Sequence, residues 1–403
     1  MFASLLAVAA ALTTTSCSDS ESVTNNTDAT QLDYTAENAA QWGNYMINTA
    51  LLLKQDANTL YNQWAVEYTK RENGKEISTG NTFAYYFKTH DSKTAYRSTN
   101  DCIQEMVEKM AEIANEVGSS KIGEPYNLWK NGDQTAAVLA VESWFSWHSR
   151  DDYTNNIRSI RNAYYGTRDC YTADSIAPHS LAAAISASNP TLHARIVGYI
   201  ANAMATIQGI SQPFRSHIDT EETVKAIDAC GKLQRIISEI ESEDGEAIGG
   251  EAVNLRDAAL ALDEDVKAEI INNFVDNVVV PTYKELNEKN AALYTAVVAF
   301  VNSPSNAGFE NCAKAWLAAR QPWETSEAFL FGPVDELGLD PNMDSWPLDA
   351  EGISQVLKNS NWAALTWSYT DDDEAISQSQ NLRGFHTLEY LIFKNGKART
   401  VSK

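Results

Sequence analysis

A histidine and a glutamate three residues apart, His386 and Glu389, are the strongest candidates for chemistry in this chain. On a helix, residues at this spacing project from one face, so the imidazole and the carboxylate are neighbours. Arg383 lies one turn earlier, on roughly the same side. Phe385 and Leu388 recur at helical spacing around the pair and predict an amphipathic helix. Spacing alone favours a buried hydrogen-bonded pair over a binding site.

Metal binding and ion pairing are the two kinds of chemistry open to these residues. His386 and Glu389 supply two metal ligands and Glu327 is a candidate third, and one imidazole with two carboxylates suits iron, manganese or zinc. Arg320 and Arg383 favour the other chemistry, because guanidinium groups pair with acids or bind an anion such as a metal chelate. No cofactor is certain from the sequence, and iron or another divalent metal is the candidate.

Three segments near the C-terminus resemble the imelysin-like family of exported, all-helical bacterial proteins. They are Gly384-x-His386-x-x-Glu389, the stretch Ala318–Pro333 and the stretch Asp344–Asp349. The resemblance implies two helical bundles, a ligand site and a role in iron uptake, and peptidase activity has also been proposed for the family. The ligand-binding residues that it implies in this half of the chain are Arg320, Ser326, Glu327, Arg383, His386 and Glu389.

A further resemblance predicts an unusual order of the two halves. In the family a second helical domain follows the histidine segment, whereas here only residues 394–403 follow it. Residues 142–166 resemble the family's second half and residues 211–214 resemble its end, so we infer a circular permutant. Permutation would place Glu142, Ser143, Ser146 and Asp152 opposite Arg320, Glu327, His386 and Glu389 in a cleft between the halves. Helix capping and turn formation are the alternative roles of Ser143, Ser146 and Asp152.

The sequence lacks the usual motifs of hydrolases. It contains neither His-Glu-x-x-His nor Gly-x-Ser-x-Gly, and His386 is the only one of six histidines in a matching segment. The leading hypothesis is a non-catalytic protein that binds a small ligand, a metal ion or a metal chelate at the inter-domain cleft, in iron uptake. The alternative is a metallopeptidase with His386 and Glu389 as metal ligands and Glu327 as ligand or base. A scaffold or adhesion module with a purely structural His–Glu pair is the third interpretation.

Helical periodicity with almost no strand alternation predicts an all-α fold. The acidic, glycine-rich segment 241–250 is the expected linker between two helical, four-helix-bundle-like domains, 34–248 and 249–403. The expected helices are one from Trp42 to near Asn73-Gly74, then 103–118, 134–148, Asn189-Pro190 to Pro213, 224–240, 266–300 with a break at Pro281, 308–330, short helices within 351–369, and a helix over 373–393, with 331–349 as loop.

The N-terminus predicts export and a lipid anchor. Residues 2–12 are apolar but too few to span a bilayer, which is typical of a signal peptide. Cys17 and its neighbours resemble a lipoprotein cleavage site, so residues 1–17 are expected to be a lipoprotein signal peptide and residues 18–33 a disordered tether. The expected location is the cell envelope, at the periplasmic or outer-membrane surface, with membrane contact only through the anchor and with an outer-membrane transport partner.

Charge and cysteine content limit the other partners. A net charge of −23 argues against nucleic acid or an anionic membrane face as a partner. The four remaining cysteines match no zinc or redox spacing, so buried thiols are expected, with a single disulfide as the alternative. They are Cys102, Cys170, Cys230 and Cys312.

Overall fold

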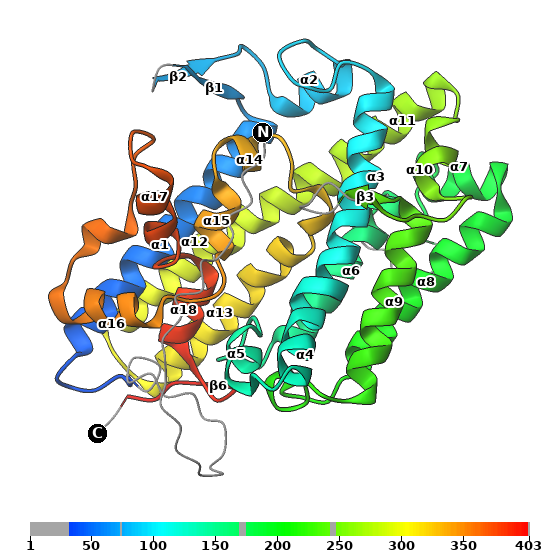
Figure 1. Ribbon diagram of the computed structural model, residues 1–403. Helices are drawn as coiled ribbons and strands as arrows, with labels where there is room; N and C mark the ends of the chain where they lie inside the picture. Colours follow the sequence, from blue (N-terminus) through cyan, green and yellow to red (C-terminus); the bar gives the residue numbers. More distant parts are fainter. Residues whose placement is uncertain (1–31, 73–74, 169–174, 242–246, 402–403) are drawn as a thin grey trace.

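The computed structural model describes residues 32–72, 75–168, 175–241 and 247–401. The fold is all-α, as predicted, with three two-stranded antiparallel hairpins at its edges (Figure 1). The expected signal peptide with Cys17, nearly all of the expected tether, and Cys170 lie outside the described residues. Within the described ranges, no helix combines the length and the apolarity needed to cross a bilayer.

One bundle is built on the first helix, α1 (Ala39–Ala65). It packs along α12 (Val280–Asn302), which in turn packs on α13 (Asn306–Glu324), and α18 (Gly384–Ile392) lies against both α1 and α13. The buried side of α1 carries Trp42 and other large apolar residues, and this stripe is covered by helices from the far end of the chain. The expected division into 34–248 and 249–403 differs from this packing, because α1 lies with helices of the second range.

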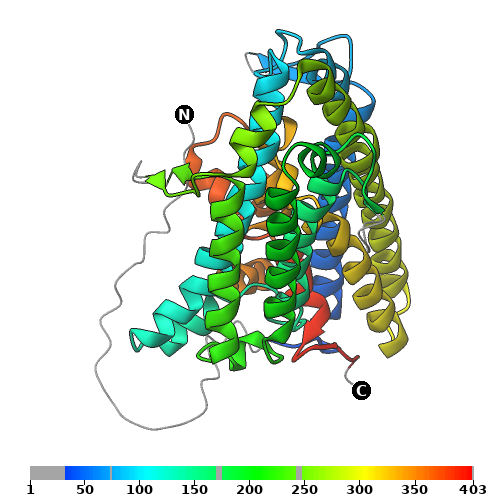
Figure 2. The ribbon, with the colours of Figure 1, turned by 90° about the vertical axis from the view of Figure 1, so that its right-hand side faces the viewer.

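The second bundle contains α3 (Thr99–Asn115), α6 (Ser149–Tyr165), α8 (Pro190–Gly209) and α9 (Glu221–Ile237), which Figure 2 shows from the side. Hydroxyl or amide side chains accept a backbone N–H at the start of α3, α8 and α9, which satisfies donors that a helix start leaves unpaired. The start of α8 at Asn189-Pro190 is as predicted. Helix α6 also packs on α13, and the two bundles meet there.

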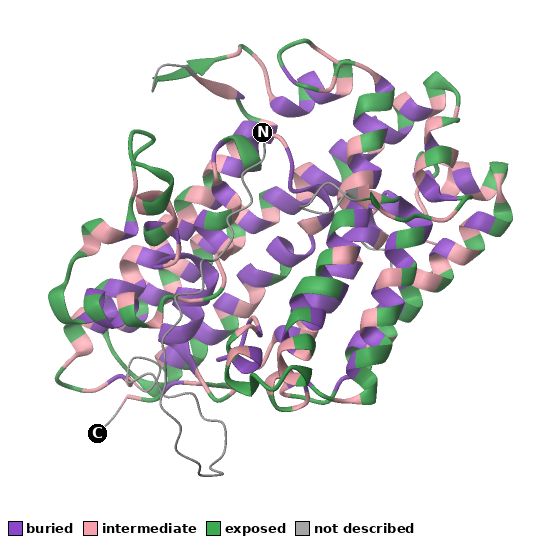
Figure 3. Cartoon of the chain, viewed as in Figure 1, coloured by how far each residue is buried: buried purple, intermediate pink, exposed green. Residues whose placement is uncertain are grey.

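Shorter elements cover the ends of both bundles. The buried apolar side chains form one core cluster, and Figure 3 shows buried residues on the helices of both bundles. The helices are α2 (Phe83–Thr89), α4 (Gly123–Lys130), α5 (Gln134–Leu139), α7 (Leu181–Ser188), α10 (Leu255–Leu260), α11 (Glu264–Phe274), α14 (Pro333–Glu336), α15 (Leu339–Asp344), α16 (Ala350–Asn359) and α17 (Asp373–Gln380), with π-helical turns at Glu116–Ile122 and Val275–Val279. The strands are β1 (Thr69–Glu72), β2 (Lys75–Ser78), β3 (Ile240–Glu241), β4 (Ala247–Ile248), β5 (Phe393–Lys394) and β6 (Lys397–Ala398).

The helix expected over 134–148 is wrong beyond Leu139, where α5 ends. Residues 140–148 form a loop in which Ser143 and Trp147 have positive φ angles of 48° and 60°. Side chains in the left-handed region are strained unless their surroundings hold them there. Here the Ser143 hydroxyl donates to Asp152 and the Ser146 hydroxyl donates to Glu389, so bonds to the two bundles replace the helical ones.

Other boundaries also differ from the expected ones, and the helix expected over 308–330 ends at Glu324. The segment 331–349 is not all loop, because Pro333 starts α14 in the first turn, where proline is tolerated, and α15 follows. The expected helix 373–393 is two helices, α17 and α18. Helix α1 ends at Ala65, since the chain then turns into the β1–β2 hairpin. Part of the expected linker forms the β3–β4 hairpin. The break near Pro281 is confirmed, with a π-helical turn before α12.

Candidate functional site

A buried guanidinium, that of Arg320 on α13, binds three carboxylates where the two bundles meet. Its Nε donates to Asp152 Oδ2 on α6 at 3.3 Å, its Nη2 lies 2.6 Å from Glu324 Oε1 without an aligned hydrogen bond, and its Nη1 pairs with Asp344 at the end of α15. Burial would lower the pKa of Arg320, but Asp344, Glu324 and Asp152 hold the pKa well above its usual value. The guanidinium is therefore charged and joins the bundles.

His386 lies between two carboxylates. Its Nε2 is 3.1 Å from Asp344 Oδ1 and its Nδ1 is 3.3 Å from Glu389 Oε2. Burial and the nearby Arg320 lower the pKa of His386, but Asp344 and Glu389 outweigh them and raise it to about 9. The imidazole is thus protonated at neutral pH, and both of its N–H groups face acids. In that state it offers no lone pair to a metal.

The loop 140–148 closes the site from the other bundle. Glu389 Oε1 accepts from the backbone N–H of Ser146 at 2.7 Å and from its hydroxyl at 2.6 Å. Asp152 accepts from the Ser143 hydroxyl as well as from Arg320. The half-buried His148 reaches the same acid from outside, with its Nε2 3.7 Å from Asp152 Oδ1. Residues separated by more than 200 positions in the chain therefore share one hydrogen-bonded network.

Three of the residues expected in the site lie elsewhere. Glu142 pairs with the buried ammonium of Lys121 at 3.1 Å. Arg383 precedes α18 on extended backbone, pairs with Asp56 of α1 and donates to the Leu365 carbonyl at 3.3 Å. The hydroxyl of Ser326 donates to the Trp323 carbonyl at 2.6 Å, in the turn after α13. The expected residues that do share the network are Ser143, Ser146, Asp152, Arg320, His386 and Glu389.

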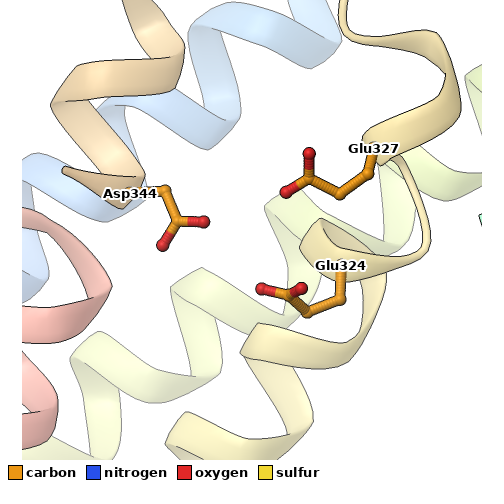
Figure 4. Close-up of side chains that lie close together, drawn as sticks. All are labelled: Glu324, Glu327 and Asp344. Atoms are coloured by element: carbon orange, nitrogen blue, oxygen red, sulfur yellow. The ribbon is translucent and has the colours of Figure 1, made fainter. Parts of the chain in front are cut away.

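Glu327 joins a group of three carboxylates with Glu324 and Asp344, whose side chains point toward one another (Figure 4). One oxygen of each lies within 4.8 Å of the others. Oxygens on opposite sides of a calcium-like ion, each about 2.3–2.6 Å from it, are about 5 Å apart, so the group fits one cation. Oxygen-only ligands suit hard cations such as magnesium, calcium and manganese, and ferric iron is hard as well.

The pKa values of these three carboxyl groups are shifted in different directions. Burial raises the pKa of Glu324 to about 8 against the opposing effect of Arg320, and burial raises the pKa of Glu327 well above its usual value against Lys121. Burial also acts to raise the pKa of Asp344, but Arg320 and His386 hold it well below the usual range. Burial therefore disfavours the charged forms of Glu324 and Glu327, and a cation bound between the carboxyl groups would oppose this effect.

Neighbouring side chains fix the orientation of the three acids. The indole N–H of Trp323 donates to Asp344 Oδ2 at 2.7 Å, and the Asn156 amide donates to Glu324 Oε2. The sequence interpretation missed Glu324 and Asp344 as site residues. The spacing of Arg320, Glu324 and Glu327 along the expected helix 308–330 could have indicated the first of these. Asp344 begins one of the three segments that resemble the family, but its role depends on contacts with Arg320 and Trp323 of α13 and His386 of α18 that only the tertiary structure brings together.

Gly384 lets α18 approach the end of α15 and is a sensitive position. It has a φ of +88°, and a Cβ there would lie 2.6 Å from the Met343 carbonyl oxygen. We expect Gly384→Ala to lower the free energy of unfolding by about 1–2 kcal/mol for the backbone angle and by about 1–3 kcal/mol more for the clash. Gly132→Ala is the matched control, since its φ is +91° with nothing near the added Cβ. Equal losses in urea unfolding of the two variants would contradict the role of close approach.

The fold and the site define a class: an all-helical protein of two packed bundles whose junction holds an arginine and a protonated histidine among buried carboxylates. The chain belongs to the imelysin family, because the family model described as Peptidase_M75: Imelysin matches residues 19–240 and 279–403.

Two solved structures and one curated protein resemble it. The crystal structure of an imelysin peptidase from Bacteroides ovatus is 50% identical, covers 93% of this chain and 100% of its own, and superposes with a TM-score of 0.83. Iron-regulated protein A of Synechococcus elongatus is 34% identical over 126 residues, which is 31% of each chain, so this chain matches less than a third of that relative. An iron-regulated protein A precursor from Parabacteroides distasonis is 38% identical over 44% of this chain and 49% of its own, with a TM-score of 0.40.

Proposed function

We propose that this protein binds iron without catalysis and serves iron uptake at the cell envelope, where a lipid on Cys17 anchors it. The observation that carries the proposal is the convergence of Glu324, Glu327 and Asp344 at the junction of the bundles. The name of the cyanobacterial relative, iron-regulated protein A, supports a role connected with iron. An outer-membrane transporter is the partner that we propose for this role.

In this proposal the three acids hold the cation and the charged groups beside them position the acids. Arg320 and His386 both contact Asp344 Oδ1, which directs the other oxygen of Asp344 toward Trp323. The protonated state of His386 makes it a second-layer residue that orients a ligand rather than a ligand itself. Glu389 acts one step further out, because it holds the imidazole and the Ser146 loop together.

The test is calorimetric titration of untagged protein with Fe²⁺ under anaerobic conditions and with Mn²⁺. We expect one ion per chain, and a loss of affinity of more than about 100-fold in the double variant Glu324→Gln, Glu327→Gln, because losing even an outer-layer partner costs about 10–100-fold. The control is Glu285→Gln, Glu288→Gln, which removes two acids at the same spacing from the more exposed side of α12.

Three outcomes would count against the proposal. Absence of heat when the wild type is titrated with Fe²⁺ and with Mn²⁺ would show that the protein binds neither ion. Equal binding by the wild type and the Glu324→Gln, Glu327→Gln variant would place the ion elsewhere. A larger loss in a folded His386→Ala, Glu389→Ala variant would assign the ion to the histidine pair instead.

A metallopeptidase is the second candidate function. The observation that favours it is the description of the 50% identical structure as an imelysin peptidase. The arrangement of His386 opposes it, since both ring nitrogens face carboxylates, and metal binding would require that one of them be released. Chelator-sensitive cleavage of a peptide library by the purified protein would favour the peptidase. No turnover with one equivalent of metal bound would exclude it.

A further inference from the structure

An apolar cavity of about 220 Å³ lies next to the polar network. Four segments that are distant in the sequence form its walls: the end of α5 with the following loop, the loop after α15, helix α16, and helix α18. Its lining includes Trp144, Phe145, Trp346, Ile353 and Tyr390. No charged side chain is among the described residues that line it, although the whole chain carries a net charge of −23.

The walls of the cavity are held in place by contacts of their own. The indole N–H of Trp346 donates to the Ala140 carbonyl at 3.1 Å and so joins two of the loops. The rings of Phe145 and Tyr390 meet edge to face with their centres 5.0 Å apart, and Arg215 stacks on the ring of Trp144 at 4.6 Å. A cavity whose walls are fixed before binding takes a ligand without an ordering cost, which is the usual condition of a small-molecule site.

The cavity touches the polar network through three residues. The ring of Trp346 also lies 4.8 Å from the ring of His386, centre to centre. The hydrogen bond between Ser146 and Glu389 joins the loop to α18. Two lining residues are next to this pair in the chain, since Phe145 precedes Ser146 and Tyr390 follows Glu389. Anything that fills the cavity therefore rests on the side chains that surround the imidazole. This position beside charged, buried groups distinguishes the cavity from a packing defect in the core.

We propose that this cavity binds a neutral aromatic group of a small molecule. Its volume exceeds the roughly 150 Å³ that is enough for benzene, so one substituted ring fits. Aromatic walls favour an aromatic occupant through edge-to-face and offset contacts. The lack of charge in the lining excludes a charged ring substituent, because burying an unpaired charge is costly. The proposal goes beyond iron binding and does not depend on it.

The experiment is a titration of the full chain with benzyl alcohol and with benzoate, followed by calorimetry and by ligand-observed NMR. Benzyl alcohol is expected to bind saturably at one site, and benzoate at least tenfold more weakly. Ala350 lines the cavity and is half-buried at the start of α16, so Ala350→Trp should fill the opening and weaken benzyl alcohol at least tenfold. Glu351→Trp, one residue along on exposed surface, is the matched control and should bind normally.

The outcomes separate this proposal from the proposed iron site. The cavity proposal is overturned if benzyl alcohol does not bind saturably to the wild type. It is also overturned if a folded Ala350→Trp variant, checked by circular dichroism, binds benzyl alcohol as tightly as the wild type does. Benzoate binding as tightly as benzyl alcohol overturns the neutral ligand class. The Glu324→Gln, Glu327→Gln variant should bind benzyl alcohol like the wild type, so a failure of the iron proposal leaves this one standing and the reverse also holds.

Discussion

Replacing Arg320 by methionine is expected to lower the free energy of unfolding by about 3–5 kcal/mol, the usual cost of breaking a buried ion pair by removing one partner. The side chain is fully buried, and its removal leaves Asp152, Glu324 and Asp344 without their shared cation. Asp152 lies on α6 and Asp344 at the end of α15, and the guanidinium joins both to α13. Its loss therefore also loosens the junction between the bundles. Urea unfolding at pH 7, followed by circular dichroism, measures the effect.

An arginine that pairs with a glutamate on the surface provides the control. Arg195 pairs with Glu251, but both side chains remain partly exposed, at 40% and 27%. Exposed pairs contribute about 0–1 kcal/mol, so Arg195→Met should change the unfolding free energy by no more than that. A loss in Arg320→Met as small as that in Arg195→Met would show that the buried network contributes little to stability and would remove the argument for a single charged junction.

The stability that His386 provides is expected to disappear at alkaline pH. Its pKa is raised to about 9 in the folded protein, against about 6.5 when unfolded. For a raised pKa, the stabilisation is complete below pH 6.5 and is lost as the pH rises through 9. The difference in pKa corresponds to about 3 kcal/mol at 1.36 kcal/mol per unit. The stability advantage of the wild type over His386→Gln should therefore shrink by about 3 kcal/mol between pH 6 and pH 10.

Unfolding of both proteins across this range measures the effect, and NMR of the imidazole gives the pKa directly. His193 is the control, because burial lowers its pKa and it faces the Tyr164 hydroxyl rather than an acid. His193→Gln should show no comparable change between pH 7 and pH 10. An advantage of the wild type that stays constant from pH 6 to pH 10 would mean that the pKa of His386 is not raised on folding.

The helices were predictable where their signals are local. The apolar stripe of α1 around Trp42, the start of α8 at Asn189-Pro190 and the break before Pro281 each depend on residues within a few turns of one another. The failures occur where distant contacts override local preference. The loop at Ser143 interrupts an expected helix because its hydroxyl bonds to Asp152 rather than to its neighbours. The permuted order of the two halves stays a prediction.

The sequence by itself determined that this protein is helical and acidic and that His386 and Glu389 share one face of a helix. Tertiary structure alone decided which charges meet. Arg383, one turn from His386 in the sequence, pairs with Asp56 on α1, while Arg320 and Asp344 enclose the imidazole from other elements. The reason is that helical spacing acts over about four residues, whereas the pairing of buried charges depends on how whole helices pack.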